Sequence, residues 1–529
     1  MPFAEFLTAV RCGNPIRART CRPMRCFSLV GALGLGAVFV ASLGTARAAA
    51  PDSTGHRVRI VQAEAILRDP AVPGVQRLVG QVVLAHRDAT LECDSAWRYD
   101  DGRFRAMGSV QAQRPQGWSI QAEDLTWDPN AELLRAQGSP TQLVDGDLSA
   151  SGPELCYDWS AESAWFRQRT TLEMEGRVAT ADRGRFDSAS NWLVLGGAVE
   201  VDGSEERVVS DSLKVHARAG DLEFLGPSRV DQTDGEWAVS CERGVIAEET
   251  GWVGGRTRRA WVRRGGEGVW ADSLAWSEAL REAWGDVEAL DTALTQVVRG
   301  EHLRQERVDS AWVSHVVGAA RLIQVSGGDT LVLVADELEE AEGRLKAFPE
   351  VVFRQGDALG MCAALIWTEQ TDDLRMLDHP RLWFEGQILT ADTLDLHLRD
   401  GEPDHLYGTG HAHLTRIIND SCADQITGRT LTGQFREGEL DRLLVEGNGE
   451  AIYFVEDDAE LQFNRAACSR LRIQIEDGRV KQIALLDAPS GRFLAFSASL
   501  PEDRWLEGTV LHEAPTPPTV APWPPEIPH

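Results

Sequence analysis

The sequence predicts an all-β, repetitive fold built from about 13 strand-turn-strand units. A short motif recurs about every thirty residues along most of the chain. Apolar residues alternate with a period of two on either side of the motif, as they do in a strand with one buried face. Turn dipeptides such as Asp-Gly separate the apolar runs, and helical periodicity is weak, with only 277–294 resembling a helix.

The motif reads apolar, any residue, small, acidic, any residue, Leu. We call its fourth place the acidic position. The segments that show the motif best are IQAEDLTW (120–127), VVSDSLKV (208–215), VWADSLAW (269–276), LVADELEE (333–340) and LTADTLDL (389–396). The acidic position falls at residues 94, 123, 153, 182, 211, 242, 272, 301, 336, 363, 392, 429 and 469, nine of which are Asp or Glu.

Small or apolar residues occupy the places one and three before the acidic position, and apolar residues return two and four places after it. From one place before the acidic position to two places after it is a step of three residues, which breaks the two-residue alternation of a strand. We therefore expect a bulge or corner at the acidic position that returns the side chains to one face. The carboxylate there is expected to accept neighbouring backbone N–H groups. The inward-facing side chains that we predict are Leu125, Trp127, Leu155, Leu213, Val215, Leu274, Trp276, Leu338, Leu365, Trp367, Leu394 and Leu396.

The N-terminus is predicted to be a secretory signal peptide, residues 1–48. It combines six arginines with the uncharged run from Phe27 to Gly44 and an Ala-x-Ala site at 46–48, and Met24 is an alternative start. An uncleaved membrane anchor is the other interpretation. The repeats are predicted to occupy 56–505, and a proline-rich, mobile tail 511–529.

The net charge of −29 disfavours nucleic-acid binding, because an acidic surface repels phosphates. No cofactor or metal is predicted. Among metal ligands, only His411 and His413, near Asp404 and His405, suggest a site, and they lack a third ligand at a fixed spacing. The six cysteines after the leader are scattered and do not indicate a disulfide framework. No nucleophile elbow, zinc-protease motif or phosphate loop is present, so an enzyme is not expected.

The recurring Ala-Asp-x-Leu signature and the segment LVGQVVLAHRDATLECDSAWRYDDGRFRAMGSV (78–110) resemble the OstA-like family, over roughly 57–500. That family comprises LptA-type periplasmic lipopolysaccharide carriers and the N-terminal domain of LptD, and this chain is similar to its long, many-repeat forms. The resemblance implies an elongated, open β-jellyroll, or β-taco, whose interior shields lipid A acyl chains. The inward-facing residues would then line a lipid groove.

The resemblance further implies a carrier or bridge in the periplasm, or in association with the outer membrane. Its expected partners are lipopolysaccharide or a related glycolipid, and other Lpt-type proteins or further copies of itself joined through edge strands. Two alternatives remain open: an extracellular β-helix that processes polysaccharide, and a secreted surface protein whose seventeen Trp include a carbohydrate platform. Shared placement of Trp127, Trp276 and Trp367 in one inward column favours a core role for these three.

Overall fold

The fold is known from a computed structural model. It describes residues 58–68, 73–115, 117–174, 176–247, 250–291, 295–326, 329–399, 402–419, 421–457, 460–476, 479–496, 499–507, 509, 511 and 513–518. Within these ranges the chain forms forty β-strands and one short 3₁₀ helix, η4 (Pro501–Arg504), and no α-helix. Neighbouring strands in these ranges pair in the antiparallel sense from one end of the described chain to the other. The predicted all-β class is confirmed.

The chain divides into two compact units. Among the described residues, the N-terminal unit comprises 58–146 and Pro153–Ala161, and the C-terminal unit comprises Asp147–Gly152 and 162–518. Strand β8 (Leu148–Asp158) contributes residues to both. The strands of the N-terminal unit are β1 (Arg59–Gln62), β2 (Ala65–Arg68), β3 (Val75–His86), β4 (Ala89–Tyr99), β5 (Phe104–Gln113), β6 (Ser119–Asp128) and β7 (Leu133–Asp145).

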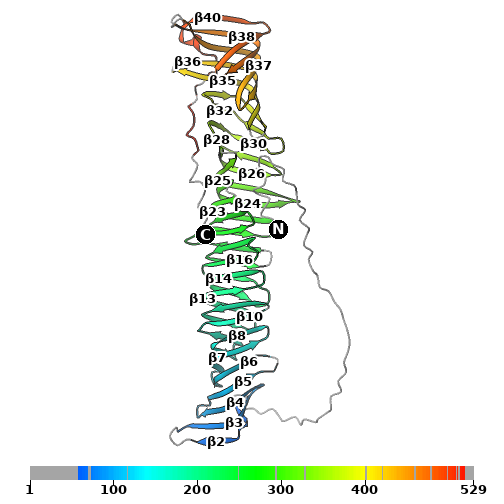
Figure 1. The fold of residues 1–529 in the computed structure, drawn as a ribbon, viewed down its shortest axis with the longest axis vertical. Helices are drawn as coiled ribbons and strands as arrows, with labels where there is room; N and C mark the ends of the chain where they lie inside the picture. Colours follow the sequence, from blue (N-terminus) through cyan, green and yellow to red (C-terminus); the bar gives the residue numbers. More distant parts are fainter. Residues whose placement is uncertain are drawn as a thin grey trace, which may run out of the picture. The chain divides into compact units, whose positions relative to one another are not determined.

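The C-terminal unit contains the remaining strands, which follow one another in stacked hairpins (Figure 1). Their bounds are β9 (Ser163–Phe166), β10 (Thr170–Met174), β11 (Arg177–Ala181), β12 (Arg183–Asp187), β13 (Trp192–Asp202), β14 (Glu206–His216), β15 (Leu222–Phe224), β16 (Ser228–Gln232), β17 (Trp237–Cys241), β18 (Arg243–Ala247), β19 (Thr250–Gly254), β20 (Ala260–Arg264), β21 (Glu267–Ala271), β22 (Ser273–Trp276), β23 (Leu280–Asp291), β24 (Gln296–Val308), β25 (Ala311–Ser326), β26 (Asp329–Ala341), β27 (Arg344–Phe348), β28 (Val351–Gln355), β29 (Ala358–Cys362), β30 (Ala364–Thr368), β31 (Asp373–Leu377), β32 (Arg381–Phe384), β33 (Gln387–Thr390), β34 (Thr393–Arg399), β35 (Glu402–Asn419), β36 (Cys422–Arg436), β37 (Glu439–Asp457), β38 (Glu460–Glu476), β39 (Arg479–Leu486) and β40 (Ser490–Ala495).

A long strand that carries an acidic position bends there and so belongs to two half-sheets. Strand β14, for example, pairs with β16 before Asp211 and with β15 after it. The extra residues of the bulge lie on the partner strand, where Gly197 and Ala198 of β13 oppose Asp211 with positive φ angles of 76° and 43°. The bulge therefore occurs opposite the acidic position, and it turns the chain so that both half-sheets keep their apolar faces inward.

The same corner recurs in both units, with an acidic side chain packed on a glycine. A side chain added at Gly108 would collide with Asp94 in the N-terminal unit, and one added at Gly285 would collide with Asp272 in the C-terminal unit. The backbone N–H of Asp272 donates to the carbonyl of Gly285 at 2.9 Å. The expected acceptance of backbone N–H groups by the carboxylate is seen at Glu242, which bonds the N–H of Thr257 at 3.1 Å.

The weak helical pattern at 277–294 does not form a helix where the structure describes it, because Leu280–Asp291 is strand β23. One face of β23 buries Ala283, Val287 and Ala289 in the interior. Their burial and the pairing of β23 with β24 outweigh the local helical pattern. The unit count of about 13 stays a prediction. The predicted signal peptide lies outside the described residues, as do residues 519–529 of the predicted tail.

Candidate functional site

The predicted inward-facing residues of the C-terminal unit lie in two rows on the inner face. The first, the corner row, passes from strand to strand through directly paired residues next to the bend. Every side chain of this row is apolar or glycine, and its leucines are buried. The corner row consists of Leu195, Leu213, Phe224, Gly244, Val253, Leu274, Ala283, Leu303, Val316, Leu338, Ala347, Leu365, Met376, Leu394 and Gly408.

The second row, the mouth row, lies two residues further from the bend and takes in Val215, Trp276, Trp367 and Leu396. Val215 is buried, whereas Trp276, Trp367 and Leu396 are only half-buried. The mouth row consists of Phe186, Leu193, Val215, Leu222, Ile246, Gly251, Trp276, Arg281, Gln305, Ser314, Glu340, Leu345, Trp367, Leu374, Leu396 and Leu406. The structure thus brings together all nine predicted groove residues of this unit.

Four consecutive members of the mouth row are polar, and we call Arg281, Gln305, Ser314 and Glu340 the polar band. The Gln305 amide donates to the Ser314 hydroxyl at 3.2 Å, and the Arg281 guanidinium lies 4.1 Å from the centre of the Trp312 ring. Burial raises the pKa of Glu340 to about 7. The band is not among the predicted inward-facing residues, because that set holds only apolar residues at the fourth place after the acidic position, where Gln305 and Glu340 also fall.

The space between the half-sheets is largely filled by side chains. One small cavity of about 30 Å³ lies between Val298 and Leu322 of one half-sheet and Leu338 and Glu340 of the other. A second, of about 10 Å³, adjoins Trp276. The first has room for roughly two water molecules and the second for about one at most. A guest chain would therefore have to displace side chains or part the half-sheets.

The inward-facing residues of the N-terminal unit end in a cluster of rings. Trp127 stacks on Trp159 with centroids 5.9 Å apart, and Trp118 meets the edge of Trp159 at 5.3 Å and tilts against Tyr157 at 5.1 Å. His86 makes edge contacts with Trp127 and Trp159. All five rings are at most 6% exposed. This aromatic cluster closes the interior beside Leu125 and Leu155, which are also buried.

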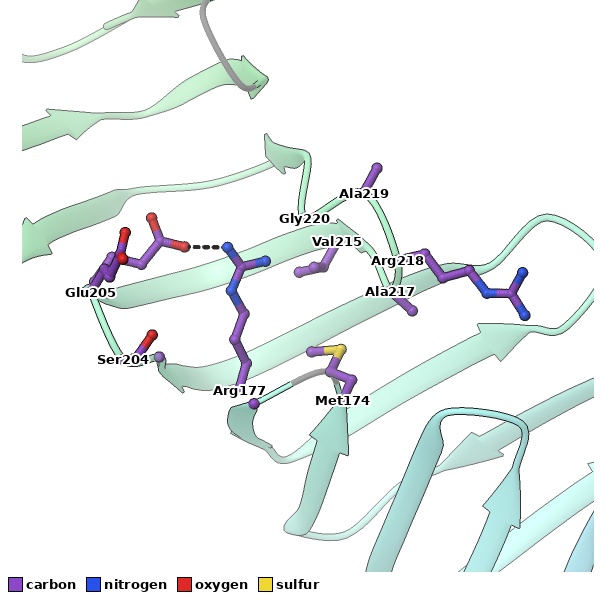
Figure 2. Close-up of a pocket in the computed structure, with 12 residues that line it drawn as sticks. Met174, Arg177, Ser204, Glu205, Val215, Ala217, Arg218, Ala219 and Gly220 are labelled. Atoms are coloured by element: carbon purple, nitrogen blue, oxygen red, sulfur yellow. Dashed lines mark hydrogen bonds and ion pairs between the residues drawn. The ribbon is translucent and has the colours of Figure 1, made fainter. Parts of the chain in front are cut away.

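A pocket opens at the mouth of the C-terminal unit, between the turn 203–206 and the turn 217–220 (Figure 2). Its volume is about 290 Å³, and its lining includes the buried apolar side chains of Met174 and Val215. Arg177 spans the opening: it donates to Glu206 at 2.7 Å, and its guanidinium packs on Gly220 at the other turn. The pocket thus combines an apolar floor with a charged rim, on which Arg218 also lies.

His405 and His411, which the sequence offered as metal ligands, each bond one carboxylate in the structure. In the described part of the chain, no group of three or more His, Cys, Asp or Glu is placed to hold a metal; His411 bonds Asp392 and His405 bonds Asp404. The six described cysteines are buried and free, and burial raises the thiol pKa of Cys241 to about 12. Within the described ranges, no helix is long and apolar enough to cross a membrane.

The fold and the interior together describe an all-β chain, in which paired half-sheets enclose a largely apolar inner face. The family model described as "OstA-like protein" matches residues 56–211, which confirms the predicted resemblance for that part of the chain. Among solved structures, the chain is similar to LptH, the LptA-homologous periplasmic component of the lipopolysaccharide transport device of Pseudomonas aeruginosa. The identity is 13%, the TM-score 0.19, and the match covers 28% of this chain and 98% of that one. No curated protein matches.

Proposed function

We propose that this chain is an exported, non-enzymatic lipid carrier or bridge that holds the acyl chains of lipopolysaccharide or a related glycolipid during transport to the outer membrane. The observation that carries the proposal is the corner row, an unbroken apolar line on the inner face of the C-terminal unit. The OstA-like match at 56–211 supports the same lipid class. The periplasm is the compartment that fits this role and the predicted signal peptide.

Acyl burial supplies the affinity in this proposal. Each buried methylene contributes about 0.8 kcal/mol, so a chain of ten or more carbons could offset the separation of packed side chains. Entry is easiest along the half-buried part of the mouth row, at Trp276, Trp367 and Leu396. These side chains are already partly in contact with solvent and lose little when a lipid chain covers them.

Free strand edges suit the proposed bridging role. Within the described residues, β1 and β2 pair only with β3, while β39 and β40 pair only with β38. Large apolar side chains are exposed beside these edges, including Val61 and Ile66 on one and Phe493 on another. Unpaired edges of this kind accept strands from another chain, so other Lpt-type proteins or a second copy could extend the sheet.

Site-specific photo-crosslinking tests the groove directly. A photo-crosslinker replaces Trp276 on the inner face or Trp252, which is 37% exposed on the outer face of the neighbouring strand β19. We expect the Trp276 position, and not Trp252, to capture radiolabelled lipopolysaccharide in cells. Equal capture at both positions, or capture at neither, would contradict the groove.

Competition experiments distinguish lipid binding from the alternative of polysaccharide binding. Unlabelled glycolipid should abolish capture at Trp276, while the same sugar chain without its acyl groups should leave capture unchanged. If the deacylated polysaccharide competes as well as the complete glycolipid, sugar recognition accounts for binding and the acyl-chain proposal is wrong.

A further inference from the structure

The outer face of the C-terminal unit carries a second line of paired residues, which we call the outer row. It runs across ten neighbouring strands of one half-sheet, from β23 to β36, and is apolar in seven of its ten places. The outer row consists of Leu290, Val297, Ile323, Val332, Arg354, Leu359, Trp383, Ile388, Thr415 and Gln425.

The part of this row between β23 and β26 is unusually buried for an outer face, whereas Arg354 on β28 is exposed. Val297, Ile323 and Val332 are 0–1% exposed, whereas Val209, on the outer face of the same half-sheet, is 44% exposed. An uncovered valine on a strand surface keeps much of its area in water, as Val209 does. Some covering therefore lies over the outer row between β23 and β26.

Two buried indole donors beside this row also lack a partner. Trp270 packs in the same cluster as Leu290, Val297 and Ile323, and Trp383 belongs to the row itself. Neither Nε1 atom has a hydrogen-bond acceptor among the described residues. A buried indole N–H normally finds an acceptor, so the covering should offer carbonyl oxygens as well as apolar surface.

The chain's own C-terminal segment begins at the end of the row. The side-chain carbonyl oxygen of Gln425 accepts from the Leu506 N–H at 2.9 Å and from the Thr509 hydroxyl at 2.7 Å, and its amide donates to the Arg504 carbonyl at 2.8 Å. Leu506 packs on Ile452 and Phe463 of the same outer face. Residue 509 is therefore fixed beside Gln425, the last member of the row.

The segment that follows residue 509 is long enough to reach from β36 to β23. Strands are about 4.8 Å apart, so the six steps from β36 to β26 measure about 29 Å and the nine steps to β23 about 43 Å. A polyproline II segment rises about 3.1 Å per residue. The nine residues 510–518 could therefore span about 28 Å, which reaches the level of β26. In Figure 1 the described part of this segment descends from the level of β36 toward that of β28. Residues 519–529 add about 34 Å, enough to pass β23.

We propose that the proline-rich segment 511–529 lies along the outer row as a strap, with residues 519–529 over Leu290, Val297, Ile323 and Val332. Polyproline II leaves every carbonyl unpaired, so it can accept from the indoles of Trp270 and Trp383. It also places residues three apart on one face, as Val520 and Trp523 are in the sequence VAPWPPEIPH. The strap would replace the mobile tail that the sequence predicted.

Crosslinking in the full-length chain tests the strap. With Trp523 replaced by p-benzoyl-phenylalanine, we expect an intramolecular adduct within 288–334, mapped by mass spectrometry. Val297→Asp should lower its yield at least fivefold, and Val209→Asp should not. An adduct to a second copy, to another protein or to a different part of the chain, or no adduct, would overturn the proposal.

A second variant tests the strap independently, in case Val297→Asp does not fold. A chain that ends at Pro518 keeps the anchor at Gln425 and all forty described strands. Removal of residues 519–529 should uncover the outer row and raise the fluorescence of the apolar dye bis-ANS several-fold, and the peptide 519–529 added in trans should reverse the rise. Unchanged dye binding would show that another group covers the row.

Discussion

The interiors of the two units differ although their corners are the same. In the N-terminal unit the aromatic cluster of His86, Trp118, Trp127, Tyr157 and Trp159 closes the inner face with rings from both half-sheets. In the C-terminal unit some equivalent places are also buried, such as Val215 and Leu222, but others hold the polar band or the half-buried side chains of Trp276, Trp367 and Leu396. One repeat therefore builds a closed interior in one part and a more accessible one in the other. The corner sets the fold, while the mouth row sets access to the interior.

The largest expected effect comes from the aromatic cluster. Trp127→Ala removes a fully buried ring that contacts two others, so we expect it to lower the free energy of unfolding by about 3–5 kcal/mol. Trp276→Ala, at the equivalent place in the C-terminal unit, should cost about a third as much because its ring is only half-buried. Urea denaturation followed by circular dichroism measures both. Equal losses would contradict the difference between the interiors.

The corners should behave alike in both units. Gly108→Ala and Gly285→Ala each place a side chain at a positive φ (77° and 75°) and against a carboxylate, so each should cost about 2–4 kcal/mol. Gly235→Ala has a similar φ of 76° but open space around it, and should cost only the backbone strain of about 1–2 kcal/mol. A large difference between Gly108 and Gly285 in thermal unfolding would show that the corner is not a common element.

The polar band predicts that the stability of the C-terminal unit depends on pH. No equivalent buried carboxylate with a raised pKa is described in the N-terminal unit. The pKa of Glu340 is about 7 in the folded chain and near 4.5 when unfolded, so the folded state binds the extra proton between these values and stability falls as the pH rises through them. Glu340→Gln removes this penalty. It should raise the free energy of unfolding by about 1–3 kcal/mol at pH 8 and by much less at pH 4.5. A gain of the same size at both pH values would argue against a buried carboxylate, and Glu339→Gln on the outer face is the control.

The smallest expected effect on stability is at the mouth pocket. Arg177 is about one third exposed and its ion pair with Glu206 lies at the rim, so Arg177→Ala should change the free energy of unfolding by less than about 1 kcal/mol. It should nevertheless open the pocket above Met174 and Val215. Hydrogen exchange of 213–216 should quicken in the variant, while that of 120–127 should not change. Unchanged exchange at both segments would show that Arg177 does not close the mouth.

The sequence predicted the parts of this fold that are local. The strand period, the small residue before the acidic position and the inward leucines, such as Leu213 and Leu394, follow from spacing within one motif. The polar band could have been read in the same column, but its continuity through Ser314 depends on which strands pair. The outer row was not predicted because its place lies outside the motif: Val297, Val332, Leu359, Ile388 and Gln425 all fall four residues before the acidic position. The return strands between them have no motif, so only cross-strand register shows that the row is continuous.

Whether the interior of this chain holds lipid acyl chains can be decided by native mass spectrometry. The sample is the full-length protein, purified without detergent from cells that make lipopolysaccharide. We expect a bound species whose mass and fragmentation identify an acylated glycolipid, and whose occupancy falls when Leu274→Asp places a charge in the corner row. A folded protein that carries no acylated molecule, or that carries one equally well with Leu274→Asp, would contradict the proposed lipid-binding interior.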